Sequence, residues 1–244
     1  MNEIHKYIKN AQSRFAAMLT TFVQVSNFDT KIYQRYLSMQ YHLTKGVQRY
    51  FITAAAHESL RRMKPLRKFL LEFACEEELH YLVAGNDLQK MGLTVLPIPF
   101  DVVLWHSYFS EVTVRAPFQR LGAACILENL SDAEVKPLAR GLLQSSFLSK
   151  DNTKFLVLHM HETLPHGLQI LEALEKAGLS EDQWNDVYEG AAKATVMYLR
   201  MAQWALFPDD LASLADARNQ NLDAAEINSI SALDMADVLA AQHD

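Results

Sequence analysis

The chain has 244 residues, with 23 basic and 29 acidic side chains and a net charge of −6, and half of its residues are hydrophobic. This hydrophobic content is enough for a buried core and excludes a disordered chain. The acidic balance argues against nucleic acid as a partner, because phosphate binding needs a basic face. With 8 glycines and 7 prolines, turn residues are too scarce for a barrel or sandwich of many short strands.

The apolar residues recur at helical spacing along almost the whole chain, which predicts an all-α fold of about seven to eight helices. Pro97 and Pro99 mark the clearest non-helical segment, and Gly92 is placed to end the helix before it. The predicted helices span residues 2–24, 30–56, 66–91, 102–110, 117–129, 132–148, 152–177 and 181–205.

Pro208 ends the last long helix, so we expect a helical domain over residues 1–207 and an acidic tail over residues 208–244. Eight acidic residues and one basic residue lie from Asp209 onward, whereas the preceding part carries 22 basic and 21 acidic residues. The acidity of the protein therefore belongs to its tail.

Two cysteines, Cys75 and Cys125, are too few for a disulfide framework and suit a reducing compartment. The sequence has no run of about 18 apolar residues that could span a membrane. We therefore expect a cytoplasmic protein with no membrane partner.

Acidic residues and histidines recur at helical spacing in two places. Glu77 and His80 are three residues apart, so their side chains lie on one face of a predicted helix. His159, Glu162 and His166 form one stripe over two turns of a later helix, in an apolar setting. Two imidazoles and a carboxylate on such a stripe are difficult to bury without a cation that neutralises and coordinates them.

Glu128 stands in an otherwise apolar helix, where an acid is costly unless it is paired or bound to metal. The alternative is an acid at a helix end that faces solvent. Together with the two preceding groups, Glu128 completes most of a carboxylate-bridged diiron site, which draws Glu and Glu-x-x-His ligands from four helices. The second lone Glu of that template has no obvious candidate, and His42 is either a substitute ligand or a core histidine.

With this order of helices and ligands, the chain resembles the haem-oxygenase-like diiron oxidases and oxygenases, relatives of the thiaminase-II and pyrroloquinoline-quinone-synthase proteins. The family's pattern is an acid and a His on one helix, a lone Glu, and then His-x-x-x-Asp-x-x-His on a later helix. Glu77 and His80 match the first element, Glu128 the second, and His159 and His166 the outer positions of the third. The resemblance implies a haem-oxygenase-like helical bundle.

This chain departs from the family's pattern in its last element. Thr163 stands at the family's Asp position, so Glu162 or His161 has to replace that ligand. Pro165 lies inside the same predicted helix, where it removes a hydrogen bond and kinks the axis. A mononuclear or metal-free site therefore remains an alternative to the diiron site.

The resemblance implies a non-haem diiron enzyme that binds two ferrous ions and uses dioxygen to cleave, decarboxylate or N-oxygenate a small amino-acid-like, amine or fatty-acid substrate. Its expected metal ligands are Glu77, His80, Glu128, His159, Glu162 and His166. This interpretation leaves room for an external electron donor and for a homodimer.

Two other classes of function remain open. The first is a metal-free enzyme of the thiaminase-II or quinone-synthase type, which uses His and Glu as acid and base or Cys75 or Cys125 as a nucleophile. The second is a non-catalytic helical binding protein. Its basic run at residues 61–68 is either a solvated face or a docking site for an acidic partner.

Overall fold

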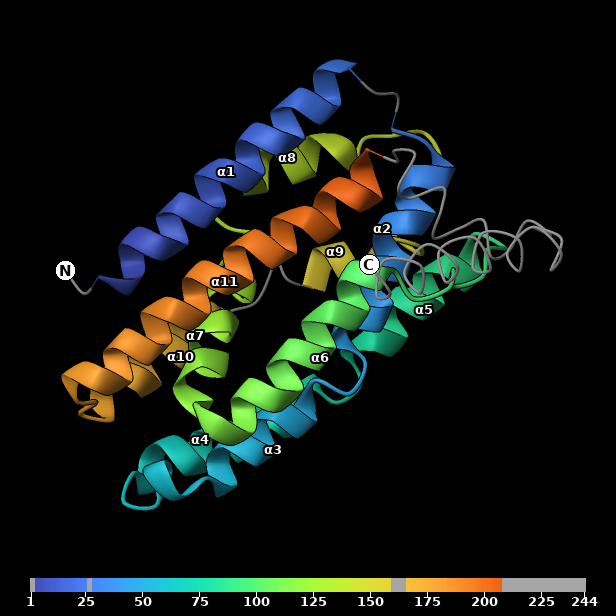
Figure 1. Cartoon of the computed structure of the whole chain (residues 1–244). Coiled ribbons are helices and arrows are strands. Elements are labelled where there is room, and N and C mark those ends of the chain that lie inside the picture. Colours follow the sequence, from blue (N-terminus) through green and yellow to red (C-terminus); the bar gives the residue numbers. More distant parts are fainter. Residues whose placement is uncertain (1–2, 26–27, 159–165, 208–244) are drawn as a thin grey trace, which may run out of the picture. The chain divides into compact units, whose positions relative to one another are not determined.

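The computed structural model describes residues 3–25, 28–158 and 166–207, and the regular structure of these residues is entirely helical (Figure 1). The chain divides into two units, 1–207 and 208–244, and all the described elements belong to the first. In chain order they are α1 (Ile4–Val25), α2 (Thr30–Thr44), α3 (Gln48–Ala56), a short 3₁₀ helix (Glu58–Leu60), α4 (Lys64–Glu77), α5 (His80–Lys90), α6 (Phe100–Arg115), α7 (Pro117–Leu127), α8 (Val135–Leu142), α9 (Lys154–Leu158), α10 (His166–Lys176) and α11 (Glu181–Leu206).

The all-α class is confirmed, but two predicted helices are each divided in two. The segment 30–56 is interrupted at Gly46, whose φ of +80° is a left-handed conformation that glycine adopts at little cost. The segment 66–91 is interrupted after Glu78, because Leu79 has left the helical conformation, with φ −110° and ψ 3°. Apolar spacing continues across both breaks, so the spacing alone did not reveal them.

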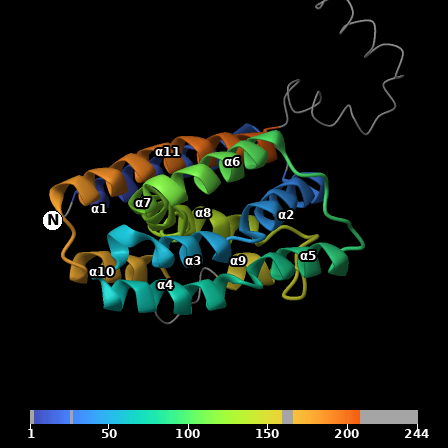
Figure 2. The same ribbon diagram turned by 60° about the horizontal axis from the view of Figure 1, so that its bottom comes forward.

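Helix α7 is the central helix of the unit, and every residue from 117 to 126 is buried. It contacts α1, α3, α6, α10 and α11, which surround it in both ribbon views (Figures 1 and 2). The contact with α11 is a backbone contact, since a Cβ at Gly122 would lie 1.9 Å from the carbonyl oxygen of Val187, and one at Gly190 would lie 1.8 Å from that of Gln119. Two glycines therefore allow α11 to lie directly against α7.

A smaller apolar cluster joins α2, α5 and α9. The buried Asp87 of α5 accepts a 2.8 Å hydrogen bond from the backbone nitrogen of Phe155, at the start of α9. The phenol of Tyr33 in α2 donates to the carbonyl oxygen of Asn152 at 2.9 Å. These bonds hold the start of α9 against α2 and α5, because both ends of each bond are buried.

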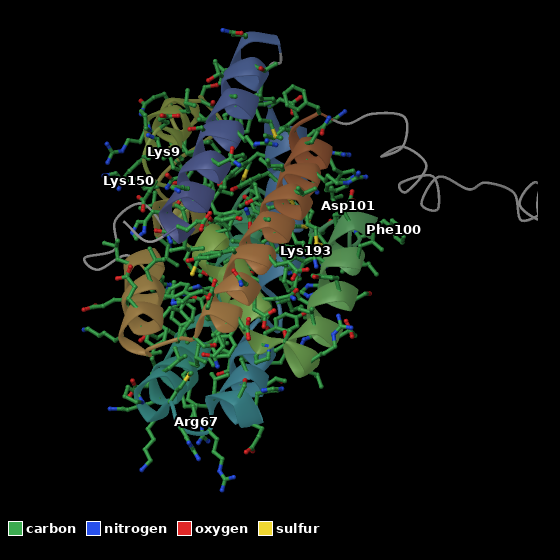
Figure 3. All side chains as sticks on the ribbon, turned by 60° about the vertical axis from the view of Figure 1, so that its left-hand side comes forward. Lys9, Arg67, Phe100, Asp101, Lys150 and Lys193 are labelled. Carbon is green, nitrogen blue, oxygen red and sulfur yellow. The ribbon has the colours of Figure 1, made fainter. Side chains whose placement is uncertain are left out.

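Basic side chains of the run 61–68 have local partners. Arg61 pairs with Glu58 at 3.3 Å, and Lys68 pairs with Glu72 at 3.5 Å. Arg67, labelled in Figure 3 at the end of the bundle that holds α3 and α4, donates to the carbonyl oxygen of Ala55 at 2.8 Å. None of the described helices is long and apolar enough to cross a membrane.

Candidate metal centre

Four of the predicted ligands, Glu77, His80, Glu128 and His166, come together in the structure. The Oε2 atom of Glu77 lies 2.8 Å from Nδ1 of His80, and the Oε1 atom of Glu77 lies 2.8 Å from Nδ1 of His166. The Nδ1 of His166 also lies 3.7 Å from Oε2 of Glu128. One donor atom each from Glu77, Glu128 and His166 lies within 4.8 Å of the other two, which is close enough for a single ion to contact all three.

The remaining predicted ligands, His159 and Glu162, lie outside the described residues, as do His161, Thr163 and Pro165. Their ligation stays a prediction.

Among the three consecutive acids, the structure selects the middle one. Glu77 is buried, whereas Glu76 and Glu78 are exposed. Glu76 lies at the rim of the cluster, with Oε2 3.5 Å from Nε2 of His166. The selection follows from the helical repeat, because neighbouring residues point about 100° apart and one of three consecutive positions faces inward.

All four residues lie at helix ends rather than on mid-helix stripes. Glu77 is the last residue of α4 and His80 the first of α5, while Glu128 directly follows α7 and His166 begins α10. The Glu-x-x-His contact thus forms across the break between α4 and α5, not along one helix.

Gly167 permits the approach of α10 to the end of α7. A Cβ on Gly167 would lie 2.4 Å from Cγ of Asn129. Asn129 is buried and its amide donates to the carbonyl oxygen of Cys125 at 2.8 Å, so it is not free to move aside. A glycine after His166 is therefore needed for this imidazole to reach Glu128.

The cluster attracts positive charge. Burial by itself raises the pKa of Glu77, but the close contacts with the imidazoles of His166 and His80 and their positive charge outweigh burial and lower this pKa to about 2. Burial lowers the pKa of His166, but its close contacts with the carboxylates of Glu128 and Glu77 and their negative charge raise it to about 10. The pKa of His80 is also raised, because Glu77 outweighs the effect of burial. Two buried or half-buried carboxylates thus favour the protonated form of both imidazoles.

The donor chemistry of this cluster fits a divalent first-row metal ion, for which carboxylate oxygen and imidazole nitrogen are ordinary ligands. A metal ion would supply the positive charge that the imidazolium protons supply in its absence. The described donors suffice for one ion. A second ion would draw on His159 and Glu162, which are outside the described residues.

A cavity of about 140 Å³ adjoins the cluster, and Glu77 and Glu128 form part of its wall. Most of its lining is apolar or aromatic. A polar group is set into this wall, where the amide of Gln40 donates to the phenol oxygens of Tyr36 at 2.9 Å and Tyr198 at 3.0 Å. The other residues that line the cavity include Phe15, Leu19, Leu43, Val47, Trp105, Leu127, Leu130 and Val135.

Arg120 also lines this cavity, and the spacing of acids and histidines does not reveal it. A signal was present in the sequence, since Arg120 is the one charged residue between Pro117 and Leu127, in a segment that otherwise reads as a buried helix. A charge in such a setting is costly and calls for a specific role.

His42, the alternative ligand considered in the sequence, is not among the residues that line the cavity. The Nε2 of His42 lies 2.7 Å from the carbonyl oxygen of Leu96, and burial lowers the pKa of this imidazole. His42 thus occupies a structural position that ties α2 to the segment before α6. Tyr41 and Tyr81 pack edge to face, with ring centroids 5.3 Å apart, and neither lines the cavity.

Neither cysteine lines the cavity. Cys125 is buried inside α7, and burial raises the pKa of its thiol, which disfavours the nucleophilic thiolate. Cys75 is exposed on α4. The positions of both thiols argue against cysteine-dependent catalysis in this cavity.

No protein-family model and no curated protein matches the sequence. A crystal structure from Shewanella denitrificans OS217, described as a domain of unknown function with a heme oxygenase-like fold, resembles the chain with a TM-score of 0.68. The sequence identity is 17%, and the match covers 81% of this chain and 90% of that one. At this identity the likeness concerns the fold alone, and it confirms the expected fold: the chain is an all-α protein with a haem-oxygenase-like fold.

Proposed function

We propose that this protein is a non-haem iron enzyme, a dioxygen-dependent oxidase or oxygenase with two ferrous ions in its complete site. The observation that carries the proposal is the convergence of Glu77, Glu128 and His166 within 4.8 Å at the wall of a largely apolar cavity. The haem-oxygenase-like fold supports the proposal by analogy only. One fold hosts several activities, so the site residues and not the fold carry the argument.

Each residue has a distinct part in this proposal. Glu77 and Glu128 supply the negative charge that balances the metal, and His80 and His166 supply neutral nitrogen ligands after losing their protons. Bound iron would supply the activation of dioxygen. The apolar cavity beside the carboxylates would hold the substrate, a small amino-acid-like, amine or fatty-acid-like molecule, and exclude bulk water from it.

A metal-free acid–base enzyme is a second candidate, favoured by the contacts of Glu77 with two imidazoles at 2.8 Å. A carboxylate that holds an imidazole in place is a common arrangement for proton transfer. Metal binding separates the two candidates.

The test is the iron content of the full chain after anaerobic loading with ferrous iron and removal of excess metal. We expect two irons per chain, and we expect Glu77→Gln to lose at least about tenfold in iron affinity, because a ligand charge is removed. Glu78→Gln is the matched control, since Glu78 is the exposed neighbour, and it should bind iron like the unaltered chain.

Further variants test the predicted ligands. His80→Ala, His159→Ala and Glu162→Gln should each reduce iron content, and the iron-loaded protein should consume dioxygen. A chain that takes up no iron, or Glu77→Gln with unchanged iron affinity, would overturn the proposal. One tightly bound iron, unaffected by His159→Ala and Glu162→Gln, would reject the second metal ion.

A further inference from the structure

Arg120 is a buried cation that lacks a charged partner. Its side chain is fully inside the protein, with 1% of the residue exposed. Among the described residues, its Nε and Nη1 have no hydrogen-bond partner, and no carboxylate forms an ion pair with it. Buried guanidinium groups are normally paired, because an uncompensated charge in the interior is costly.

Aromatic rings surround the guanidinium of Arg120. Its Cζ lies 5.0 Å from the ring centroids of Tyr50 and Phe51 and 5.7 Å from that of Phe109. Such rings stabilise a cation through their faces, but they accept no strong hydrogen bond in the guanidinium plane. The rings therefore hold the group in place and leave N–H donors for another acceptor.

The charge of Arg120 persists at neutral pH. Burial lowers its pKa to about 10, while the negative charges of Glu128 and Glu77 act against that shift. The two carboxylates lie in the wall of the same cavity, but their close contacts are with the imidazoles of the cluster. Arg120 is thus a charged donor at the cavity wall with hydrogen-bonding capacity to spare.

We propose that Arg120 binds the carboxylate of the substrate, and that the substrates are small monocarboxylates with an apolar group about the size of one six-membered ring. The size follows from the cavity of about 140 Å³, since an apolar cavity of about 150 Å³ accepts benzene. A planar carboxylate matches the fork of N–H donors of a guanidinium. The inference rests on the proposed function in placing this substrate beside the metal cluster.

Other ligand charges fit the cavity less well. A simple amine would bring a second cation to Arg120. A phosphate dianion would need another cation, and Arg120 is the only Lys or Arg among the described residues that line the cavity. The arginine therefore narrows the three substrate classes expected from the sequence to those that carry a carboxylate.

The test is calorimetric titration of the full chain, metal-free and iron(II)-loaded, with phenylacetate and with its neutral isostere phenylacetamide. We expect phenylacetate to bind at least about tenfold more tightly than phenylacetamide, because the pairing with a buried cation is worth more than a neutral hydrogen bond. Arg120→Met should abolish this preference, and Arg120→Lys should retain part of it.

Arg49→Met is the matched control. Arg49 contacts the same ring, with Cζ 4.9 Å from the Tyr50 centroid and Nη2 2.9 Å from its hydroxyl, but it is exposed. This variant should bind phenylacetate like the unaltered chain. Equal binding of the two ligands by the unaltered chain would overturn the proposal even if Arg120→Met does not fold. A folded Arg120→Met that keeps the preference would also overturn it.

The two proposals fail separately in this experiment. Phenylacetate binding to the metal-free chain through Arg120, with no uptake of iron, would support the carboxylate site and reject the iron enzyme. Uptake of iron without preference for phenylacetate would support the iron enzyme and reject the carboxylate site.

Discussion

Glu77 is the residue that links the cluster, because its two oxygens contact both imidazoles. The low pKa of Glu77 and the raised pKa of His166 describe one interaction from its two partners, so its energy is counted once. In the metal-free chain this interaction keeps a proton on His166 at pH values well above those at which an ordinary histidine loses it. A metal ion that uses the same nitrogen has to displace that proton.

Metal affinity should therefore rise with pH between pH 6 and pH 9. The pKa of His166 is about 10, so its proton is present throughout this interval, whereas Glu77, with a pKa of about 2, has no proton to lose. Each displaced proton increases the affinity about tenfold per pH unit. Titration with cobalt(II), followed by its visible spectrum, measures the slope.

His166→Gln is the comparison, because it keeps a polar group but removes the titrating nitrogen. It should bind cobalt more weakly and with a smaller pH slope. A pH-independent affinity in the unaltered chain would mean that no histidine proton is displaced.

At the level of elements, the cluster depends on where four helices end. The ends of α4 and α7 and the starts of α5 and α10 supply one residue each. A helix end can be placed precisely only if the neighbouring side chains leave room for it. At the start of α10, the absence of a Cβ on Gly167 leaves room for the side chain of Asn129. The geometry of the site therefore depends on residues that bind nothing themselves.

Gly167→Ala should reduce metal affinity at least about tenfold and destabilise the fold by about 1–3 kcal/mol, since the added methyl group overlaps the buried Asn129. Metal titration and thermal unfolding measure the two effects. Gly141→Ala, in α8, is the control, because a Cβ there has no neighbour within 4 Å, and it should stabilise the fold by about 0.5–1 kcal/mol.

The double variant Gly167→Ala/Asn129→Ala tests the cause of that effect. Removing the Asn129 side chain takes away the atoms with which the new methyl group would overlap. Metal affinity should recover in part. No recovery would show that Gly167 acts through its own backbone freedom and not through this contact.

At the level of the whole molecule, the net charge is divided unevenly between residues 1–207 and 208–244. The segment 1–207 carries 22 basic and 21 acidic residues, and the tail contributes the net negative charge. All the cluster and cavity residues described above belong to 1–207. The net negative charge of the protein thus comes from residues outside the segment that contains the candidate site.

A chain that ends at Phe207 should keep the unfolding temperature within about 2 °C and keep the iron content, because the described core lies within 1–207. It should also lose its retention on an anion-exchange column at neutral pH. A fall of more than about 5 °C would show instead that the tail packs against the helical unit, and a salt dependence of that fall would point to the basic run 61–68 as its docking site.

Several features of the fold and site followed from the sequence because they depend on local patterns. Apolar spacing predicted helices, and the three-residue spacing of Glu77 and His80 predicted their contact. The position of Glu128 in an otherwise apolar segment predicted that this acid would join them. The helical repeat accounts for the inward position of Glu77, whereas its contact with His80 forms across the break between α4 and α5.

The tertiary structure decided the features that depend on neighbours distant in the chain. Three such features leave no repeating pattern in the sequence: the breaks within two predicted helices, the position of Gly167 opposite Asn129, and the cavity that Arg120 shares with the carboxylates. Local spacing determined the helices and the candidate ligands, whereas the packing of those helices decided which ends meet and which charge faces the cavity. The physical reason is that periodicity reports only which residues point inward, while close packing determines what each of them meets there.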